Sequence, residues 1–157
     1  MAWTILDTAR LRQIDLFTHM SEKSLEELAA ITYTRDYRRG EKIFSDGDQG
    51  EAMYTILKGE VRISKSIPGL GEEALAILKE GHYFGEMALL DDEPRSADAW
   101  AGSTCLLSVI SKADLLMLTE RSPSLEAEVL RSFVRTLSRR LREANSKVTF
   151  LAAAGKF

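Results

Sequence analysis

The spacing of apolar residues changes twice along the chain, from helical to β-type and back to helical. In the first part, Thr4 with Asp7 three positions later forms a capping box, and Ser21 suits the N-cap of a second helix. Apolar residues recur at helical spacing after these two starts, at Ile5, Leu6, Ala9 and Leu11 and then at Leu25, Leu28, Ala29 and Ile31. Helices are therefore expected within residues 4–31.

Residues 32–110 contain short apolar runs separated by glycine-containing turns. The expected strands are Lys42–Phe44, Met53–Leu57, Val61–Ser64, Glu73–Leu78, Asp98–Ala101 and Thr104–Ile110. Strands this short, recurring at intervals of about ten residues, predict a compact antiparallel roll or barrel. Lys58-Gly59-Glu60 is typical of a hairpin turn between its two flanking runs, and Pro68-Gly69-Leu70-Gly71 marks a second turn.

Helical signals return at residue 111. Ser111 with Asp114 forms a capping box, and Ser122 followed by Pro123 is typical of an N-cap with proline at the first helical position. Gly155 is a plausible stop for the last helix, so C-terminal helices are expected over residues 111–154. Because strands do not alternate with helices, the fold class is α+β, with an antiparallel β-roll flanked by N-terminal helices and a long C-terminal helix. The length suits a single domain, residues 1–157.

The last helix contains apolar residues at alternating steps of four and three, which is a heptad seam and predicts a parallel coiled-coil dimer. The seam residues are Leu130, Val134, Leu137, Leu141, Ala144, Val148 and Leu151. The alternative is an amphipathic helix packed on its own β-roll. Phe133 and Phe150 lie off the seam and could dock on the roll, so one helix could serve both purposes. Its many arginines suit the solvated face of a coiled coil, and the alternatives are an acidic partner and, after that, nucleic acid.

Composition narrows the class of protein. Hydrophobic residues at 45% and charged residues at 29% are typical of a soluble globular chain. The formal charge of −3 argues against bulk electrostatic binding to nucleic acid. A single cysteine excludes an internal disulfide, and no signal peptide or membrane span is recognisable. A cytoplasmic location is expected.

The segment Phe84–Ala97 contains the residues best suited to bind a ligand. Gly85 allows close backbone approach, and Arg95 presents a planar fork of donors that fits a phosphate. Glu86 beside a phosphate would repel it, unless the carboxylate accepts a hydrogen bond from a sugar hydroxyl. Ser96 adds a hydroxyl donor. The alternative is an ordinary core helix followed by a surface arginine.

Phe-Gly-Glu, a small apolar helix, an acidic turn and Pro-Arg-Ser-Ala together resemble the phosphate-binding cassette of the cyclic nucleotide-binding domain family. We call residues Phe84–Ala97 the cassette. The glycine pattern Phe44…Gly47-Asp48…Gly50…Tyr54…Ile56…Gly59…Val61 is also similar to that of the family's β-roll. The resemblance covers about Leu16 to Leu151 and implies an eight-stranded roll. It implies that Arg95, Ser96 and the Gly85–Ala88 backbone bind phosphate, Glu86 binds ribose, and the purine lies against Ile63 and Leu75. A role as core residues is an equally natural interpretation of Ile63 and Leu75. The ligand contacts expected in all are Gly85, Glu86, Met87, Ala88, Arg95, Ser96, Ala97, Ile63, Leu75 and Asn145.

The sensor half of the catabolite activator protein group is the nearest likeness, with two departures. That group continues into a helix-turn-helix DNA-binding domain, whereas this sequence ends at Phe157, so DNA binding is not carried over. Where the group places a Thr-Ser pair facing the base, this chain has Ala144-Asn145. Asn145 could offer its amide to a purine edge or be a solvent-exposed polar residue, and Arg140 is close enough in sequence to belong to the base end of the pocket.

The sequence contains no clear pattern for a catalytic site or a metal site. The acidic run Asp91-Asp92-Glu93 is more typical of a solvated turn than of a cation site, and His19, His82 and Cys105 form no nucleophile–base pattern. The leading hypothesis is a receptor for cyclic AMP rather than cyclic GMP, with no enzymatic activity or cofactor, that forms a homodimer and signals to an effector protein. The alternatives are a constitutive dimerisation adaptor that no longer binds nucleotide, the excised sensor of a larger regulator, and a DNA-associated regulator.

Overall fold

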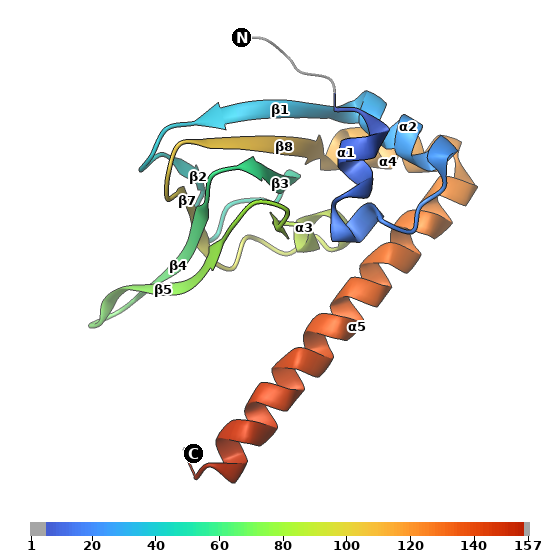
Figure 1. The fold of residues 1–157 in the computed structure, drawn as a ribbon. Helices are drawn as coiled ribbons and strands as arrows, with labels where there is room; N and C mark the ends of the chain where they lie inside the picture. The colour runs from blue at the N-terminus through green and yellow to red at the C-terminus, as the bar shows by residue number, and fades with distance from the viewer. Residues whose placement is uncertain (1–5, 156–157) are drawn as a thin grey trace.

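The computed structural model describes residues 6–155 and begins with short helices packed at one end of a β-roll (Figure 1). These are α1 (Thr8–Arg12), the 3-10 helix η1 (Asp15–Phe17) and α2 (Glu22–Ile31). Ser21 caps α2 as expected, because its Oγ accepts from the Ser24 N–H. Thr4 and Ile5 lie outside the described residues. Asp7 is the N-cap of α1 and accepts from the Arg10 N–H, so it precedes the helix instead of lying inside its first turn.

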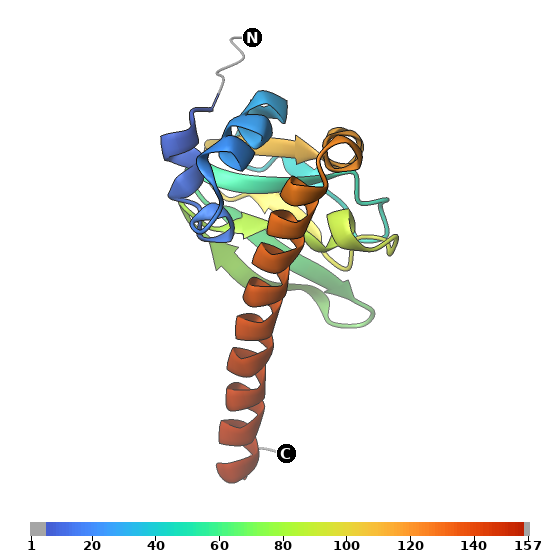
Figure 2. The same cartoon turned by 90° about the vertical axis from the view of Figure 1, so that its right-hand side faces the viewer.

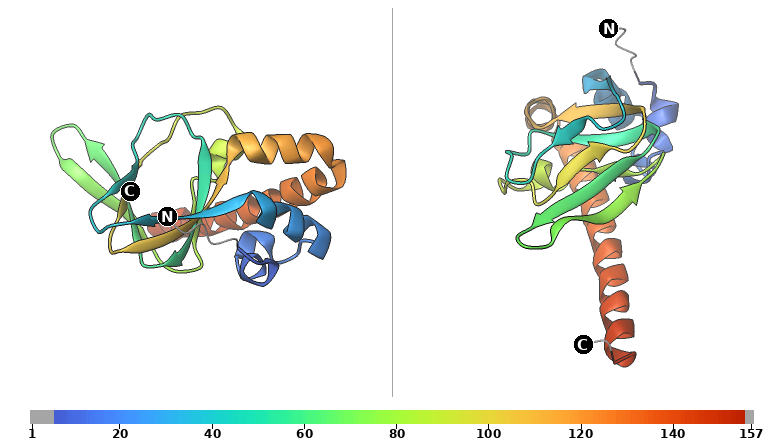
Figure 3. Two further views of the ribbon diagram at one scale, coloured as in Figure 1. Left: turned by 90° about the horizontal axis from the view of Figure 1, so that it is seen from above. Right: turned by 90° about the vertical axis from the view of Figure 1, so that its left-hand side faces the viewer.

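Within the described part of the chain, eight strands form two four-stranded antiparallel sheets, which confirms the predicted α+β roll. The strands are β1 (Thr32–Tyr37), β2 (Lys42–Phe44), β3 (Ala52–Lys58), β4 (Val61–Ile67), β5 (Gly71–Leu78), β6 (Tyr83–Phe84), β7 (Asp98–Ala101) and β8 (Cys105–Ser111). Their order is β1-β8-β3-β6 in one sheet and β2-β7-β4-β5 in the other. The hairpin of β4 and β5 projects from the roll (Figure 3).

The hairpin expected at Lys58-Gly59-Glu60 is wrong. β3 and β4 belong to different sheets, so this turn carries the chain from one layer to the other. Gly59 has φ +91°, and a Cβ there would lie 2.4 Å from the carbonyl oxygen of Thr104. Glycine is therefore required at Gly59 both for its backbone conformation and for close contact with the loop before β8.

Two apolar clusters hold the fold together. One lies between the sheets, where Ile56, Val61, Ala99 and Leu107 are almost fully buried. The other joins the N-terminal and C-terminal helices to the end of the roll, and its members include residues of α2, α4 and α5. The cassette lies where these two clusters meet, because Phe84 belongs to the first and Leu89 to the second.

The C-terminal helices are α4 (Lys112–Arg121) and α5 (Pro123–Ala153). Their predicted caps form: Ser111 Oγ accepts from the Asp114 N–H at 3.0 Å, and Ser122 Oγ accepts from the Leu125 N–H at 3.4 Å. α5 ends at Ala153, and Gly155 takes the left-handed conformation with φ +66°.

α5 packs on the body only along its first half and then extends away from it (Figures 1 and 2). Phe133 is 2% exposed and docks in the helical cluster, whereas Phe150 is 68% exposed and does not dock. The expectation that Phe150 packs on the roll is therefore wrong for this structure. Every seam residue is exposed except Leu137, which is partly buried. The seam is therefore an uncovered apolar face.

Candidate functional site

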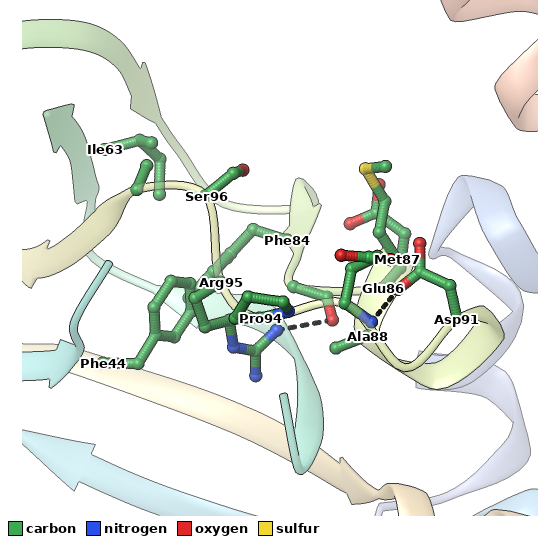
Figure 4. Close-up of a pocket in the computed structure, with 13 residues that line it drawn as sticks. Phe44, Ile63, Phe84, Glu86, Met87, Ala88, Asp91, Pro94, Arg95 and Ser96 are labelled. Carbon is green, nitrogen blue, oxygen red and sulfur yellow. Dashed lines mark hydrogen bonds between the residues drawn. The ribbon is translucent and has the colours of Figure 1, made fainter. Parts of the chain in front are cut away.

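A cavity of about 300 Å³ lies between the cassette and the strands β2 and β4 (Figure 4). It is lined by Phe44, Ile63, Phe84, Gly85, Glu86, Met87, Ala88, Asp91, Glu93, Pro94, Arg95, Ser96 and Ala97. Eight of the ten expected ligand contacts are in this lining. Leu75 and Asn145 are not: Leu75 is 58% exposed on β5, and Asn145 is exposed on the outer half of α5. Their contact with a base stays a prediction.

Two glycines let the backbone fold into this shape. Gly85 has φ +75°, and a Cβ there would lie 2.7 Å from Nη1 of Arg95. Gly50, in the loop before β3, faces the four-residue helix α3 (Met87–Leu90), and a Cβ on it would lie 1.9 Å from the Cβ of Ala88. Close approach of two backbone segments thus brings α3 against the pocket.

The turn at Gly47-Asp48 fixes the backbone of Arg95 from both directions. The Arg95 N–H donates to the carbonyl of Asp48 at 2.7 Å, and the Gly47 N–H donates to the carbonyl of Arg95 at 2.8 Å. The glycine pattern of the roll and the arginine of the cassette are therefore parts of one local structure.

Arg95 is 8% exposed, and its side chain lies over the Phe44 ring, with 4.2 Å between its Cζ and the ring centroid. Nη1 donates to the carbonyl of Gly85 at 2.8 Å, and Nη2 donates to the carbonyl of Ala52. Figure 4 shows Arg95 beside Phe44, and a dashed line marks its hydrogen bond to the Gly85 carbonyl. Burial lowers the pKa of Arg95, while the nearby Tyr54 and Glu86 act in the opposite direction. The site therefore contains a cation that is only partly compensated.

Glu86 is 4% exposed and pairs with a residue of α5. Nη1 of Arg140 donates to Oε1 of Glu86, and the same guanidinium lies 4.6 Å from the centroid of the Tyr83 ring. The sequence suggested Arg140 for the base end of the pocket, but the structure places it at the Glu86 carboxylate. The contact joins residues 54 positions apart, and neither residue type nor helical spacing signals it.

Five lining residues were not expected as ligand contacts: Phe44, Phe84, Asp91, Glu93 and Pro94. Asp91 and Glu93 flank Asp92 in the acidic turn. Within residues 6–155 no group of three or more His, Cys, Asp or Glu side chains is arranged to hold a metal ion.

The other weak candidates have structural contacts. Nδ1 of His82 accepts from the Lys79 N–H at 3.0 Å, which closes the turn before β6. Cys105 is buried, and its thiol donates to the carbonyl of Glu60 at 3.0 Å.

Comparison with known proteins agrees with this geometry. The sequence profile of the cyclic nucleotide-binding domain matches residues 34–122. The chain belongs to the cyclic nucleotide-binding domain family.

Relatives of this family member carry the same domain within longer chains. The cyclic AMP receptor protein of Thermus thermophilus is 35% identical over 87% of this chain, and a cAMP-dependent protein kinase regulatory subunit of Debaryomyces hansenii is 35% identical over 66% of it. This chain spans 62% and 22% of the lengths of those two proteins. A crystal structure of a cyclic nucleotide-binding domain from Methylobacillus flagellatus is 25% identical and superimposes with a TM-score of 0.80, covering 94% of this chain and 87% of that one.

Among residues 6–155, no helix has both the length and the apolar character required to cross a membrane.

Proposed function

We propose that the cavity binds a cyclic nucleotide, cyclic AMP in preference to cyclic GMP, and that the protein is a sensor without catalytic activity. The observation that carries the proposal is the placement of a buried, partly compensated arginine and a buried carboxylate in one cavity of the family's cassette. The preference for cyclic AMP rests on the similarity to the Thermus cyclic AMP receptor protein and the Debaryomyces regulatory subunit of cAMP-dependent protein kinase.

In this proposal Arg95 binds the phosphate. Its guanidinium carries five N–H donors, of which two are directed to the carbonyls of Gly85 and Ala52. The phosphate oxygens accept from the remaining N–H groups of Arg95, or from the two that leave the Gly85 and Ala52 carbonyls when the nucleotide binds. Ser96 and the Gly85–Ala88 backbone add neutral donors, and Ala97 also lines the cavity.

Glu86 accepts a hydrogen bond from the ribose 2′-hydroxyl. Its Oε1 already accepts from Arg140, so a nucleotide either uses Oε2 or displaces the guanidinium. Both outcomes change the charge environment of Arg140, which belongs to α5. The ligand thus has a direct physical connection to the helix that carries the predicted dimer seam.

The purine lies between Ile63 at the pocket edge and a segment of α5 beyond Arg140 that closes over it, with Leu75 and Asn145 as further contacts. Binding then slows amide hydrogen exchange across residues 144–151, because a ligand shifts an equilibrium only through contacts made in one state. The exposed seam supports a homodimer through α5, whose altered position is read by an effector protein.

Isothermal titration calorimetry with cyclic AMP, cyclic GMP and a cyclic dinucleotide tests the proposal. We expect saturable binding of the two mononucleotides, tighter for cyclic AMP, and none of the dinucleotide. Absence of binding for all three would favour the alternative of a constitutive dimerisation adaptor. The presence of both Arg95 and Glu86 argues against that alternative, since an adaptor has no need of either side chain in the cavity.

A further inference from the structure

A lysine at the start of α4 contacts the acidic turn of the cassette. Nζ of Lys112 donates to the carbonyl of Asp91 at 2.9 Å and to Oδ1 of Asp92 at 2.9 Å. The Lys112 side chain is 24% exposed, whereas that of Asp92 is fully exposed. The carbonyl of Asp91 directly follows α3, so the ammonium lies at the C-terminal end of that helix.

The backbone of Lys112 is fixed next to the same site. Its N–H donates to the carbonyl of Glu51 at 2.8 Å. The following residue, Ala52, accepts from Nη2 of Arg95. Lys112 and Arg95 therefore bond to the carbonyls of two consecutive residues. The Lys112 side chain contacts the cassette at Asp91, four residues before Arg95.

The acidic turn is otherwise unexplained by nucleotide binding, because carboxylates near a phosphate disfavour it. Pairing with Lys112 gives the turn a defined role. Its hydrogen bond and charge lower the pKa of Asp92. The contact with the Asp91 carbonyl is partly buried and fixes the backbone at the end of α3.

We propose that Lys112 is a positioning residue that holds the cassette in its binding geometry and transmits cassette movement to α4. The inference rests on the proposed function, since it concerns control of the same nucleotide site. α4 is packed against α5 in the helical cluster, where Leu115, Leu125 and Val129 are buried together. Movement of the acidic turn on nucleotide binding is thus passed from Lys112 through α4 to α5.

The test compares Lys112→Met with the matched control Lys58→Met in the full chain. Lys58 is an exposed lysine at the end of β3, and no hydrogen bond or ion pair of its side chain is found among residues 6–155. Calorimetry with cyclic AMP is expected to show affinity weakened about threefold to tenfold for Lys112→Met, because a partly buried charge-assisted bond and an exposed ion pair are lost. Lys58→Met is expected to bind as the unsubstituted protein does.

Hydrogen exchange provides a second readout. In Lys112→Met, cyclic AMP at saturation is expected to protect the cassette while the protection of α5 decreases. Lys112→Arg keeps a donor and a charge and is expected to restore part of both effects. Asp92→Asn changes a fully exposed side chain and is expected to leave the protein folded. It is expected to weaken binding less than twofold, because the bond to the Asp91 carbonyl remains.

The outcomes separate the two proposals. A folded Lys112→Met with unchanged affinity and unchanged protection of α5, even with a lower melting temperature, would overturn the role of Lys112 and leave the proposed function intact. No nucleotide binding by the unsubstituted protein would overturn both. Loss of affinity with full protection of α5 at saturation would overturn the transmission through α4.

Discussion

Replacing Arg95 by alanine removes both a proposed hydrogen-bond donor to the ligand and a side chain that holds the cassette in place. In the ligand-free protein the guanidinium joins the carbonyls of Gly85 and Ala52 and lies on the Phe44 ring. The substitution therefore weakens the cassette before any nucleotide is added.

The cost in stability follows from these contacts. Two charge-assisted hydrogen bonds contribute about 1.5–3 kcal/mol each, and the contact with the ring about 0.5–1 kcal/mol. Burial of the guanidinium, which lowers its pKa, offsets much of this gain. We expect the free energy of unfolding to fall by about 1–3 kcal/mol, which leaves an ordinary domain folded at room temperature.

The loss in binding follows from the same donors. A bidentate contact with phosphate is worth more than one charge-assisted bond, but binding exchanges some of the fork's bonds to carbonyls for bonds to phosphate. We therefore expect cyclic AMP to bind Arg95→Ala about tenfold to a hundredfold more weakly. Arg95→Lys keeps the charge without the planar fork of donors, so its affinity for cyclic AMP should lie between those of the unsubstituted protein and Arg95→Ala.

Calorimetry at a temperature well below the melting midpoint, located by circular dichroism, measures the effect on folded protein. Arg39→Ala is the control, because Arg39 is an exposed arginine for which no hydrogen bond or ion pair is found among the described residues. An unchanged affinity in folded Arg95→Ala would refute the assignment of Arg95 to the phosphate.

Three further substitutions probe the rest of the site and the seam. Glu86→Gln should weaken binding of cyclic AMP by about threefold to tenfold but have little effect on a 2′-deoxy analogue; equal losses with both ligands in calorimetry would remove the ribose contact. Leu141→Glu would place paired carboxylates in the predicted coiled-coil interface and should yield monomers in sedimentation velocity; a variant that still sediments as a dimer would contradict the seam. Gly50→Ala should displace α3, because the added carbon would lie 1.9 Å from the Cβ of Ala88. Calorimetry should show nucleotide affinity reduced at least tenfold while the roll stays folded. An affinity equal to that of the wild type would show that the loop adjusts without moving the cassette.

Sequence alone predicted the parts of this fold that depend on neighbours three or four residues apart. The caps at Ser21, Ser111 and Ser122 form through bonds within one helical turn. The pocket was predictable for a similar reason. Most of its lining is one contiguous segment, Phe84–Ala97, so its residue types appear together in the sequence.

The features that sequence did not predict depend on distant partners. The turn at Gly59 has the local composition of a hairpin, and its contact with Thr104 decides that the chain changes sheets there. The pairing of Glu86 with Arg140 depends on how α5 lies across the end of the roll. Phe133 and Phe150 are equally apolar, and only the point at which α5 leaves the body makes one buried and the other exposed.

The position of Arg139 and Arg140 gives α5 the geometry of a lever. Arg139 pairs with Asp15 of η1 and Arg140 with Glu86, and beyond them every described residue from Leu141 to Gly155 is exposed. The thirteen helical residues Leu141–Ala153 extend for about 20 Å at 1.5 Å per residue, so a tilt of about 10° at the two arginines displaces the end of the helix by about 3–4 Å. A displacement of that size is about the width of one side-chain contact. A small tilt of α5 at the Glu86 carboxylate would thus reach the far end of the helix as a change that a packed interface registers.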